Sequence, residues 1–290
     1  MTPEIRLLTE ASQLLAVEKL QAKVWGGTRV VPAHLLMAIT HSGGIVLGAY
    51  ADEKQIGFTF SFPGVNEADQ KPKQSSHMLA VDPQYQGQGI GFALKRAQWQ
   101  MARKKDVELI TWTFDPLMSK NAFLNLVKLG AVSKTYIRNL YGELEDELNQ
   151  GVESDRFLAE WWLNSERVNS RLSKNPRGPL AINDIYSAGA ILLNESKLSK
   201  QSLPEPTDKT IEIDPSPQNR PKIVLVEIPS NYQSIKNDDL DLAVAWRLHS
   251  RDLFERLFPI GYIVSDFIFI ANEHPRSFYV LSDGQATLGD

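Results

Sequence analysis

The chain has 290 residues, of which 42% are hydrophobic and 23% charged, a composition that is ordinary for a folded protein and indicates neither disorder nor a fibrous repeat. Its formal net charge of -4 and its pI near 5.8 disfavour a surface that binds nucleic acid by neutralising phosphates. The absence of cysteine excludes disulfides, thiolate metal sites and cysteine nucleophiles.

The N-terminal residues lack the basic, apolar and small-residue segments of a signal peptide. No apolar run approaches the roughly 20 residues that a membrane-spanning helix needs. We therefore expect a cytoplasmic protein without membrane contact.

The first half of the chain alternates strand and helix patterns. The patterns predict a strand over Ile5–Thr9, a helix over Glu10–Trp25, a hairpin within 44–63, a polar loop over 65–76, a strand over His77–Val81, a glycine-rich turn, a helix whose apolar face is Phe92, Ala93, Leu94, Ala97 and Met101, a strand over Val107–Phe114, a helix over Ser119–Leu129 closed by Gly130, and a strand over Val132–Tyr141.

The second half is predicted from weaker patterns. Residues 153–169 indicate a helix with an aromatic face, and the proline-rich residues 194–222 indicate a linker or long surface loop. Beyond them, we expect a strand over Ile223–Ile228, a helix over Asp239–Phe258, and strands over Tyr262–Ala271 and Ser277–Leu281.

The glycine-rich turn is Gln86-Gly87-Gln88-Gly89-Ile90-Gly91, between a strand and a helix. Glycines in such a place let the backbone approach a phosphate, and the N–H groups at the helix start point toward negative charge. A P-loop would need a lysine after the last glycine, where Phe92 and Ala93 stand instead. A dinucleotide fold expects this turn after its first strand, not after the fourth.

The turn resembles motif A of the GNAT acetyltransferase superfamily, [Q/R]-x-x-G-x-[G/A], with Gln86, Gly89 and Gly91 at the matching positions. The order of elements over about residues 1–142 resembles that of the family, which is β-α-α-β-β-β-α-β-α-β. The resemblance implies an α/β (α+β) GNAT acyl-CoA N-acyltransferase fold, with a mixed, mostly antiparallel sheet flanked by helices and followed by a C-terminal α/β extension.

The same resemblance assigns binding residues for acetyl-CoA or another short acyl-CoA. In the family the fourth strand separates from the fifth and pairs with pantetheine, which places Leu79, Ala80 and Val81 along that arm. The turn Gln86–Gly91 would hold the pyrophosphate, and Asn125 could bond pantetheine or water.

The catalytic residues depart from the pattern of the family. The family often uses a tyrosine on the helix after the fifth strand to protonate the leaving thiolate. Anchored on Gly130, that position holds Leu126, with Ser119 at the family's asparagine position. Leucine has no proton to donate. Tyr136 and Tyr141 are the nearest substitutes, and His77 is a candidate base.

The expected domains are a GNAT domain over 1–145, a helical segment over 146–193, the linker over 194–222, and an extension over 223–290. The extension is either a degenerate GNAT-like half or a cover for the first sheet. The segments 154–162 and 226–229 also resemble a group of predicted acetyltransferases that have a C-terminal extension. In 154–162, Asp155 either lines an acceptor pocket or lies on a solvated helix face.

The resulting hypothesis is an acyl-CoA-dependent N-acyltransferase that moves an acetyl group directly to a small-molecule amine. The alternatives are a CoA-binding or regulatory module without catalysis, and a fold that has lost its ligand. We expect no metal, because the histidines lack ligand spacing. We expect neither nucleic acid nor a membrane to be a partner. The oligomer that we consider is a homodimer.

Overall fold

The computed structural model describes residues 3–26, 30–142 and 151–284. The chain divides into two compact units: residues 1–112 with 160–164 form unit 1, and residues 113–159 with 165–290 form unit 2. The predicted domain boundary at residue 145 lies outside the described residues, so it stays a prediction.

Unit 1 is built on a mixed sheet whose strands follow one another in chain order. The sheet is antiparallel from β1 to β4, and β4 pairs with β5 in parallel. This confirms the mostly antiparallel sheet that the sequence predicted. The strands are β1 (Glu4–Leu7), β2 (Ile45–Ala51), β3 (Lys54–Val65), β4 (Pro72–Val81) and β5 (Leu109–Phe114), the last of which continues into unit 2.

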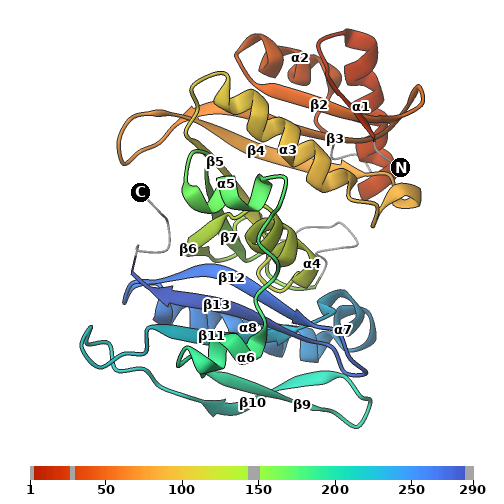
Figure 1. Cartoon of the computed structure of the whole chain (residues 1–290). Coiled ribbons are helices and arrows are strands. Elements are labelled where there is room, and N and C mark those ends of the chain that lie inside the picture. Colours follow the sequence, from red (N-terminus) through yellow and green to blue (C-terminus); the bar gives the residue numbers. More distant parts are fainter. Residues whose placement is uncertain (1–2, 27–29, 143–150, 285–290) are drawn as a thin grey trace. The chain divides into compact units, whose positions relative to one another are not determined.

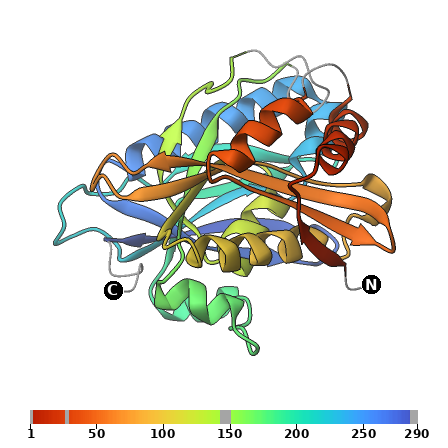
Figure 2. The same cartoon turned by 90° about the horizontal axis from the view of Figure 1, so that it is seen from above.

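Helices cover both faces of this sheet (Figure 2). On one face, α1 (Ala11–Trp25) and α2 (Ala33–His41) enclose a core with Phe58 and Phe60 of β3. On the other face lies α3 (Ile90–Arg103). Gly57 allows α3 to approach β3, because a Cβ atom there would lie 3.3 Å from both Ile90 and Leu94.

In unit 2 the strands pair in the order β6-β12-β13-β11-β8, and this part of the sheet is here called the second sheet (Figure 1). It is antiparallel except for the pairing of β11 with β8. Its elements are α4 (Ser119–Ala122), a π-helical turn η2 (Phe123–Lys128), β6 (Val132–Ile137), α5 (Glu166–Leu172), α6 (Ile182–Ser187), β8 (Ile191–Leu192), β9 (Asn194–Leu198), β10 (Pro204–Thr210), β11 (Ile223–Pro229), α7 (Tyr232–Asp238), α8 (Leu240–Leu257), β12 (Tyr262–Ile270) and β13 (Arg276–Asp283).

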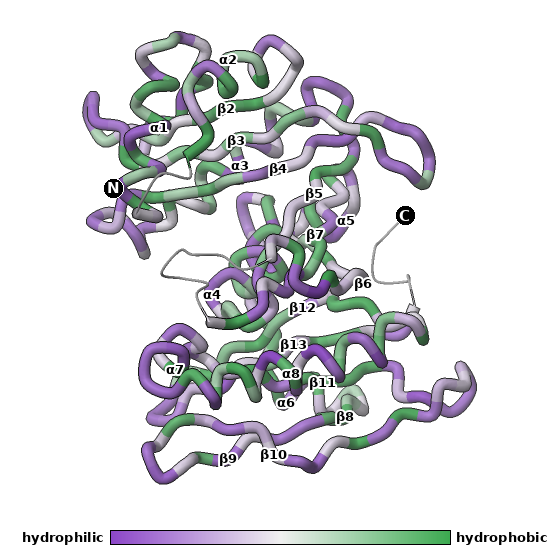
Figure 3. Tube along the Cα trace, turned by 180° about the vertical axis from the view of Figure 1, so that it is seen from behind, coloured by the Kyte–Doolittle hydropathy of each residue, from purple (hydrophilic) through white to green (hydrophobic). Residues whose placement is uncertain are grey.

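The alternation of side chains along β13 builds a core on each face of the second sheet. Phe278 and Val280 pack with Ile185 of α6, whereas the ring of Tyr279 lies 5.4 Å from that of Phe254 on α8. Figure 3 shows β12 and β13 as largely hydrophobic and the β9–β10 hairpin as largely hydrophilic. Among the helices that the structure describes, none is long and apolar enough to cross a membrane.

The helix predicted over 153–169 is wrong in its first half. Residues Arg156–Trp162 form strand β7, and the helix α5 begins only at Glu166, capped by the Ser165 hydroxyl. Most side chains of β7 are buried, on both faces. A strand that is buried on both sides has no alternating pattern, so its aromatic residues are easily mistaken for one face of a helix.

The linker predicted over 194–222 is also wrong in part. Its first half forms the antiparallel hairpin β9–β10. Pro204 and Pro206 lie in β10, which among the described strands pairs only with β9 and is therefore an edge strand, where a missing N–H is tolerated. The strands and helix predicted beyond residue 222 are confirmed as β11, α8, β12 and β13.

The order β11-α7-α8-β12-β13 repeats the order β1-α1-α2-β2-β3 of unit 1. The sheets differ, because β1 pairs with β2, whereas β11 pairs with β13. The likeness of the extension to a GNAT half is therefore limited to the order of elements along the chain.

Candidate acyl-CoA site

The glycine-rich turn is anchored at its start by Asp82, which follows β4 and is 1% exposed. Its carboxylate accepts hydrogen bonds from the backbone N–H of Gln84, at 3.2 Å, and from Nζ of Lys23, at 2.6 Å. The hydrogen bond from Lys23 lowers the pKa of Asp82 below its usual value. The chain thus leaves β4 in a fixed direction, through a single 3₁₀ turn at Pro83–Tyr85.

Gln86 closes the turn onto the strand, because its side-chain Nε2 donates to the carbonyl of Val81 at 3.1 Å. Gly87 and Gly89 both have positive φ, at 77° and 80°, which disfavours residues with a Cβ atom. Gly89 is the N-cap of α3. The motif residues therefore determine the path of the backbone.

This path leaves a row of unpaired amides at the start of α3. From Gly87 to Phe92, none of the backbone N–H groups has a hydrogen-bond acceptor within the described residues, and the first bond back to the turn runs from Ala93 to Gly89 at 3.0 Å. A Cβ atom at Gly87 or Gly89 would find no neighbour within 4 Å, so the space before these amides is open. Such a cradle fits a phosphate or pyrophosphate.

The pairing of β4 with β5 ends well before the end of β4, as expected for strands that separate. The parallel pairing of β4 with β5 runs from Lys73 to Ser75 and reaches Thr111 of β5. Beyond it, Leu79, Ala80 and Val81 pair with β3 on one side, and no ladder to β5 is recorded for them in the described chain. Their backbone groups on that side form the free edge of β4, which a pantetheine arm could pair with.

His77 occupies a bulge in β4, because Ser76 and Met78 pair with successive residues of β3 while His77 has no partner there. Its ring lies 5.5 Å from that of Phe60 and 6.1 Å from that of Phe62. The desolvation that accompanies this packing lowers the pKa of His77 below its usual value. A lowered pKa favours the neutral imidazole, which is the form that a base requires.

The two candidate tyrosines, both in unit 2, have different surroundings. The hydroxyl of Tyr136 donates to Asp155 at 2.6 Å, and burial raises the pKa of Tyr136 well above its usual value. Tyr141 is 46% exposed, and its hydroxyl lies 2.8 Å from that of Thr113 near the end of β5. Tyr141 is thus the tyrosine that a ligand could reach.

The positions on the helix after β5 are buried. Leu126, which stands at the family's tyrosine position, is fully buried, and Asn125 is 4% exposed. The hydroxyl of Ser119 lies 2.9 Å from that of Ser277 on β13, so this position bonds to the C-terminal sheet. Gly130 has the positive φ expected of a helix C′ residue. The side chains at these positions therefore belong to the core of unit 2.

A buried polar cluster beneath β4 was missed from the sequence. Nζ of Lys95 on α3 donates to Ser76 at 2.8 Å and to Gln98 at 3.1 Å, and Lys95 is 3% exposed. The predicted apolar face of α3 was shifted, since the buried residues are Ile90, Leu94, Lys95, Gln98 and Ala102. The signal available in the sequence was that two polar residues, Lys95 and Gln98, occur at helical spacing among the buried apolar residues of α3.

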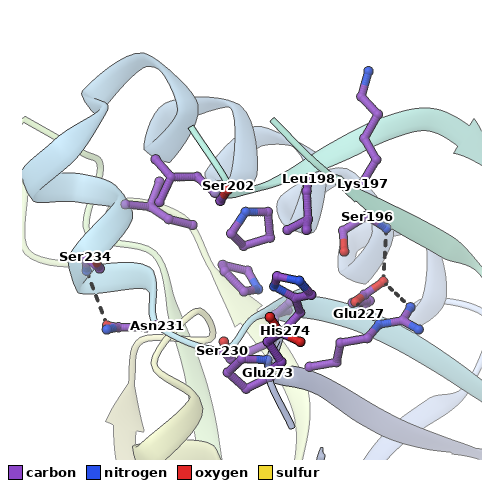
Figure 4. Close-up of a pocket in the computed structure, with 17 residues that line it drawn as sticks. Ser196, Lys197, Leu198, Ser202, Glu227, Ser230, Asn231, Ser234, Glu273 and His274 are labelled. Carbon is purple, nitrogen blue, oxygen red and sulfur yellow. Dashed lines mark hydrogen bonds and ion pairs between the residues drawn. The ribbon is translucent and has the colours of Figure 1, made fainter. Parts of the chain in front are cut away.

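Unit 2 also contains a separate cavity of about 360 Å³, shown in Figure 4. It lies between the β9–β10 hairpin, the end of β11, the start of α7 and the β12–β13 turn. The carboxylate of Glu227 accepts from Arg276 at 2.7 Å and from the backbone of Ser196 at 3.0 Å. None of the predicted site residues lines this cavity.

The expectation that no metal is required stays a prediction. In residues 3–26, 30–142 and 151–284, no group of three or more histidine, aspartate or glutamate side chains has the arrangement of a metal site.

Comparison with known proteins agrees with this geometry. Residues 42–124, which include the free edge of β4, the turn and α3, match the family model of the acetyltransferase (GNAT) domain. A search of curated proteins found no significant match. Residues 42–124 are thus similar to the GNAT acetyltransferase domain, in agreement with the motif A found in the sequence.

Several solved structures are similar to part of the chain. An aminoglycoside acetyltransferase from an uncultured soil metagenomic sample is 22% identical, with a TM-score of 0.36 over 40% of this chain and 79% of its own. The ribosomal-protein-S18-alanine N-acetyltransferase of Escherichia coli is 18% identical, with a TM-score of 0.43 over 55% and 92%. A GNAT family acetyltransferase of Elizabethkingia anophelis with acetyl-CoA bound is 18% identical, with a TM-score of 0.41 over 56% and 98%.

Proposed function

We propose that the protein is an acyl-CoA-dependent N-acyltransferase that moves an acetyl group from acetyl-CoA to a small-molecule amine. The observation that carries the proposal is the row of unpaired amides from Gly87 to Phe92, with open space at Gly87 and Gly89, within the segment that matches the GNAT domain. Backbone amides at a helix start bind a pyrophosphate by direct hydrogen bonds and by the helix dipole.

In the proposed reaction the amine attacks the thioester directly, and no covalent enzyme intermediate is needed. The nitrogen–carbon bond forms, the carbon–sulfur bond breaks, and the thiolate of CoA takes up a proton. We assign the donation of that proton to Tyr141, whose hydroxyl is accessible, and not to Tyr136, whose proton is bonded to Asp155. His77 is the candidate base for the ammonium, because its lowered pKa favours the neutral imidazole.

A second function, a CoA-binding module without catalysis, is favoured by one observation. Leu126 replaces the family's tyrosine and is fully buried, so no acid can act from that position. Both functions require that the glycine-rich turn binds CoA, and only the first includes catalysis. Retained binding of acetyl-CoA with no thioester loss across a panel of small amines selects the module.

The test of the turn is the variant Gly89→Glu, which adds bulk and negative charge where a pyrophosphate would bind. We expect calorimetric titration with acetyl-CoA and with free CoA to show binding to the unchanged protein and none to this variant. Gly178→Glu is the matched control, because it adds the same charge at an open position of unit 2 without a positive φ. Unchanged affinity in a folded Gly89→Glu protein contradicts the assignment.

A further inference from the structure

Lys95 lies at the point where β4 and β5 separate. The last parallel pair is Ser75 with Thr111, so Ser76 and Trp112 would form the next pair. The ammonium of Lys95 contacts both: it donates to Ser76 at 2.8 Å and lies 3.9 Å from the centroid of the Trp112 ring. The side chain of Lys95 thus links β4 and β5 at the residues where the two strands begin to diverge.

The charge of Lys95 is buried without a carboxylate. The side chains around its ammonium are those of Ser76, Gln98, Trp112 and, with its ring centroid at 5.7 Å, Trp161. None of these titrates near neutral pH, and no ion pair of Lys95 is recorded among the described residues. Burying an unpaired ammonium costs free energy, which the hydrogen bonds and the tryptophan face offset only in part.

This environment makes the charge sensitive to pH. Burial lowers the pKa of Lys95 to about 7. When the amine is charged, it donates to both Ser76 and Gln98 and is attracted by the face of Trp112. When it is neutral, it loses that attraction, and its link between the strands weakens.

We propose that Lys95 is a positioning residue for acyl-CoA, whose ammonium holds Ser76 and Trp112 in place and thereby fixes the free edge of β4. The inference rests on the proposed function, in which Leu79, Ala80 and Val81 on that edge bind pantetheine. Lys95 does not touch the ligand. It acts through Ser76, three residues before Leu79.

The experiment is a calorimetric titration of the full chain with acetyl-CoA, from about pH 6 to about pH 9, on the unchanged protein and on Lys95→Met. Methionine has a similar length and no charge. We expect the variant to bind about tenfold more weakly at the acid end, where Lys95 is charged. The difference should fall to within about twofold at the alkaline end, because the amine is then neutral in the unchanged protein as well.

Two further variants make the result specific. Arg96→Met removes a charge from the neighbouring, exposed position of α3, and we expect the ratio of its affinity to that of the unchanged protein to be constant across pH. Lys95→Arg keeps its charge throughout this range, so its affinity should lack the step near pH 7. It also serves if Lys95→Met does not fold, as judged by near-UV circular dichroism.

The outcomes separate the two proposals. If the unchanged protein binds acetyl-CoA, and the ratio between it and Lys95→Met is the same at every pH, the positioning role is overturned while the proposed function stands. A step near pH 7 that persists in Lys95→Arg overturns it equally. If the unchanged, folded protein binds no acetyl-CoA at any pH, the proposed function itself fails.

Discussion

At the scale of single residues, the two candidate tyrosines should respond differently to loss of the hydroxyl. Tyr141→Phe removes an exposed hydroxyl, and we expect kcat to fall by about 100-fold with little change in the affinity for acetyl-CoA. Steady-state kinetics with any active amine, combined with calorimetry, measures both quantities. An unchanged kcat would exclude Tyr141 as the acid.

Tyr136→Phe is expected to act on stability instead. Its hydroxyl bonds to Asp155, which is fully buried and also accepts from Arg251 at 2.8 Å. Removing the donor leaves a buried carboxylate with one partner fewer, which should lower the free energy of unfolding by about 1–3 kcal/mol. Urea unfolding checks this, and a loss of kcat in a protein of unchanged stability would contradict it.

The buried Lys95 predicts a dependence of stability on pH. In the unfolded chain its pKa returns to the ordinary value near 10.4, whereas in the folded protein burial lowers it to about 7. Between these values the unfolded state binds the extra proton, so stability rises with pH by up to about 1.4 kcal/mol per unit. Below about pH 7 this contribution is constant.

Lys95→Met is the reference for this measurement, because it has no amine to titrate. The difference in unfolding free energy between the unchanged protein and Lys95→Met should move in favour of the unchanged protein by about 2 kcal/mol from pH 7 to pH 9. Denaturant titrations at a series of pH values give this difference. A difference that does not vary with pH would show that Lys95 keeps its charge on folding.

At the scale of elements, two of the three glycines of the turn, Gly89 and Gly91, should differ in their tolerance of alanine. Gly89 is left-handed, so Gly89→Ala should destabilise the fold by about 1 kcal/mol. Gly91 lies in the first turn of α3, where a Cβ atom would meet Leu79 at an ordinary 3.7 Å, so alanine should be neutral or stabilising by up to about 1 kcal/mol. Thermal unfolding of both variants measures the difference, and equal effects would contradict the assigned backbone geometry.

The elements also show where sequence patterns were sufficient. The strand-turn-helix from β4 to α3 was predictable, because glycine positions and alternation are local signals. The strand β7 was missed because it is buried on both faces, and the hairpin β9–β10 because its prolines stand on an edge strand. Lys95 was missed because helical periodicity identifies buried positions by their apolar residues. The burial of Lys95 depends instead on Trp112 of β5 and Trp161 of β7, which are distant from it in the sequence.

At the scale of the whole molecule, contacts distant in the sequence stabilise each unit. In unit 2, Arg171 of α5 and Asp266 of β12 form an ion pair at 2.5 Å with side chains 3% and 5% exposed. Asp266→Ala would leave a buried guanidinium unpaired, and we expect a loss of about 3–5 kcal/mol in the free energy of unfolding.

The exposed pair Asp252–Arg256 on α8 is the control for this effect. Asp252→Ala removes a carboxylate from an i,i+4 pair in solvent and should cost no more than about 0.5 kcal/mol. Chemical denaturation of both variants tests the prediction. A similar cost for the two would mean that burial does not govern the strength of the pair in α5 and β12.

The central claim is that the amides from Gly87 to Phe92 bind the pyrophosphate of an acyl-CoA. Backbone amide NMR of the labelled full chain, recorded as acetyl-CoA is added, tests it most directly. The account predicts that the N–H resonances of these residues, together with those of Leu79–Val81, shift with the ligand concentration. Binding that leaves them unchanged and instead shifts residues of the cavity around Glu227 would contradict the account.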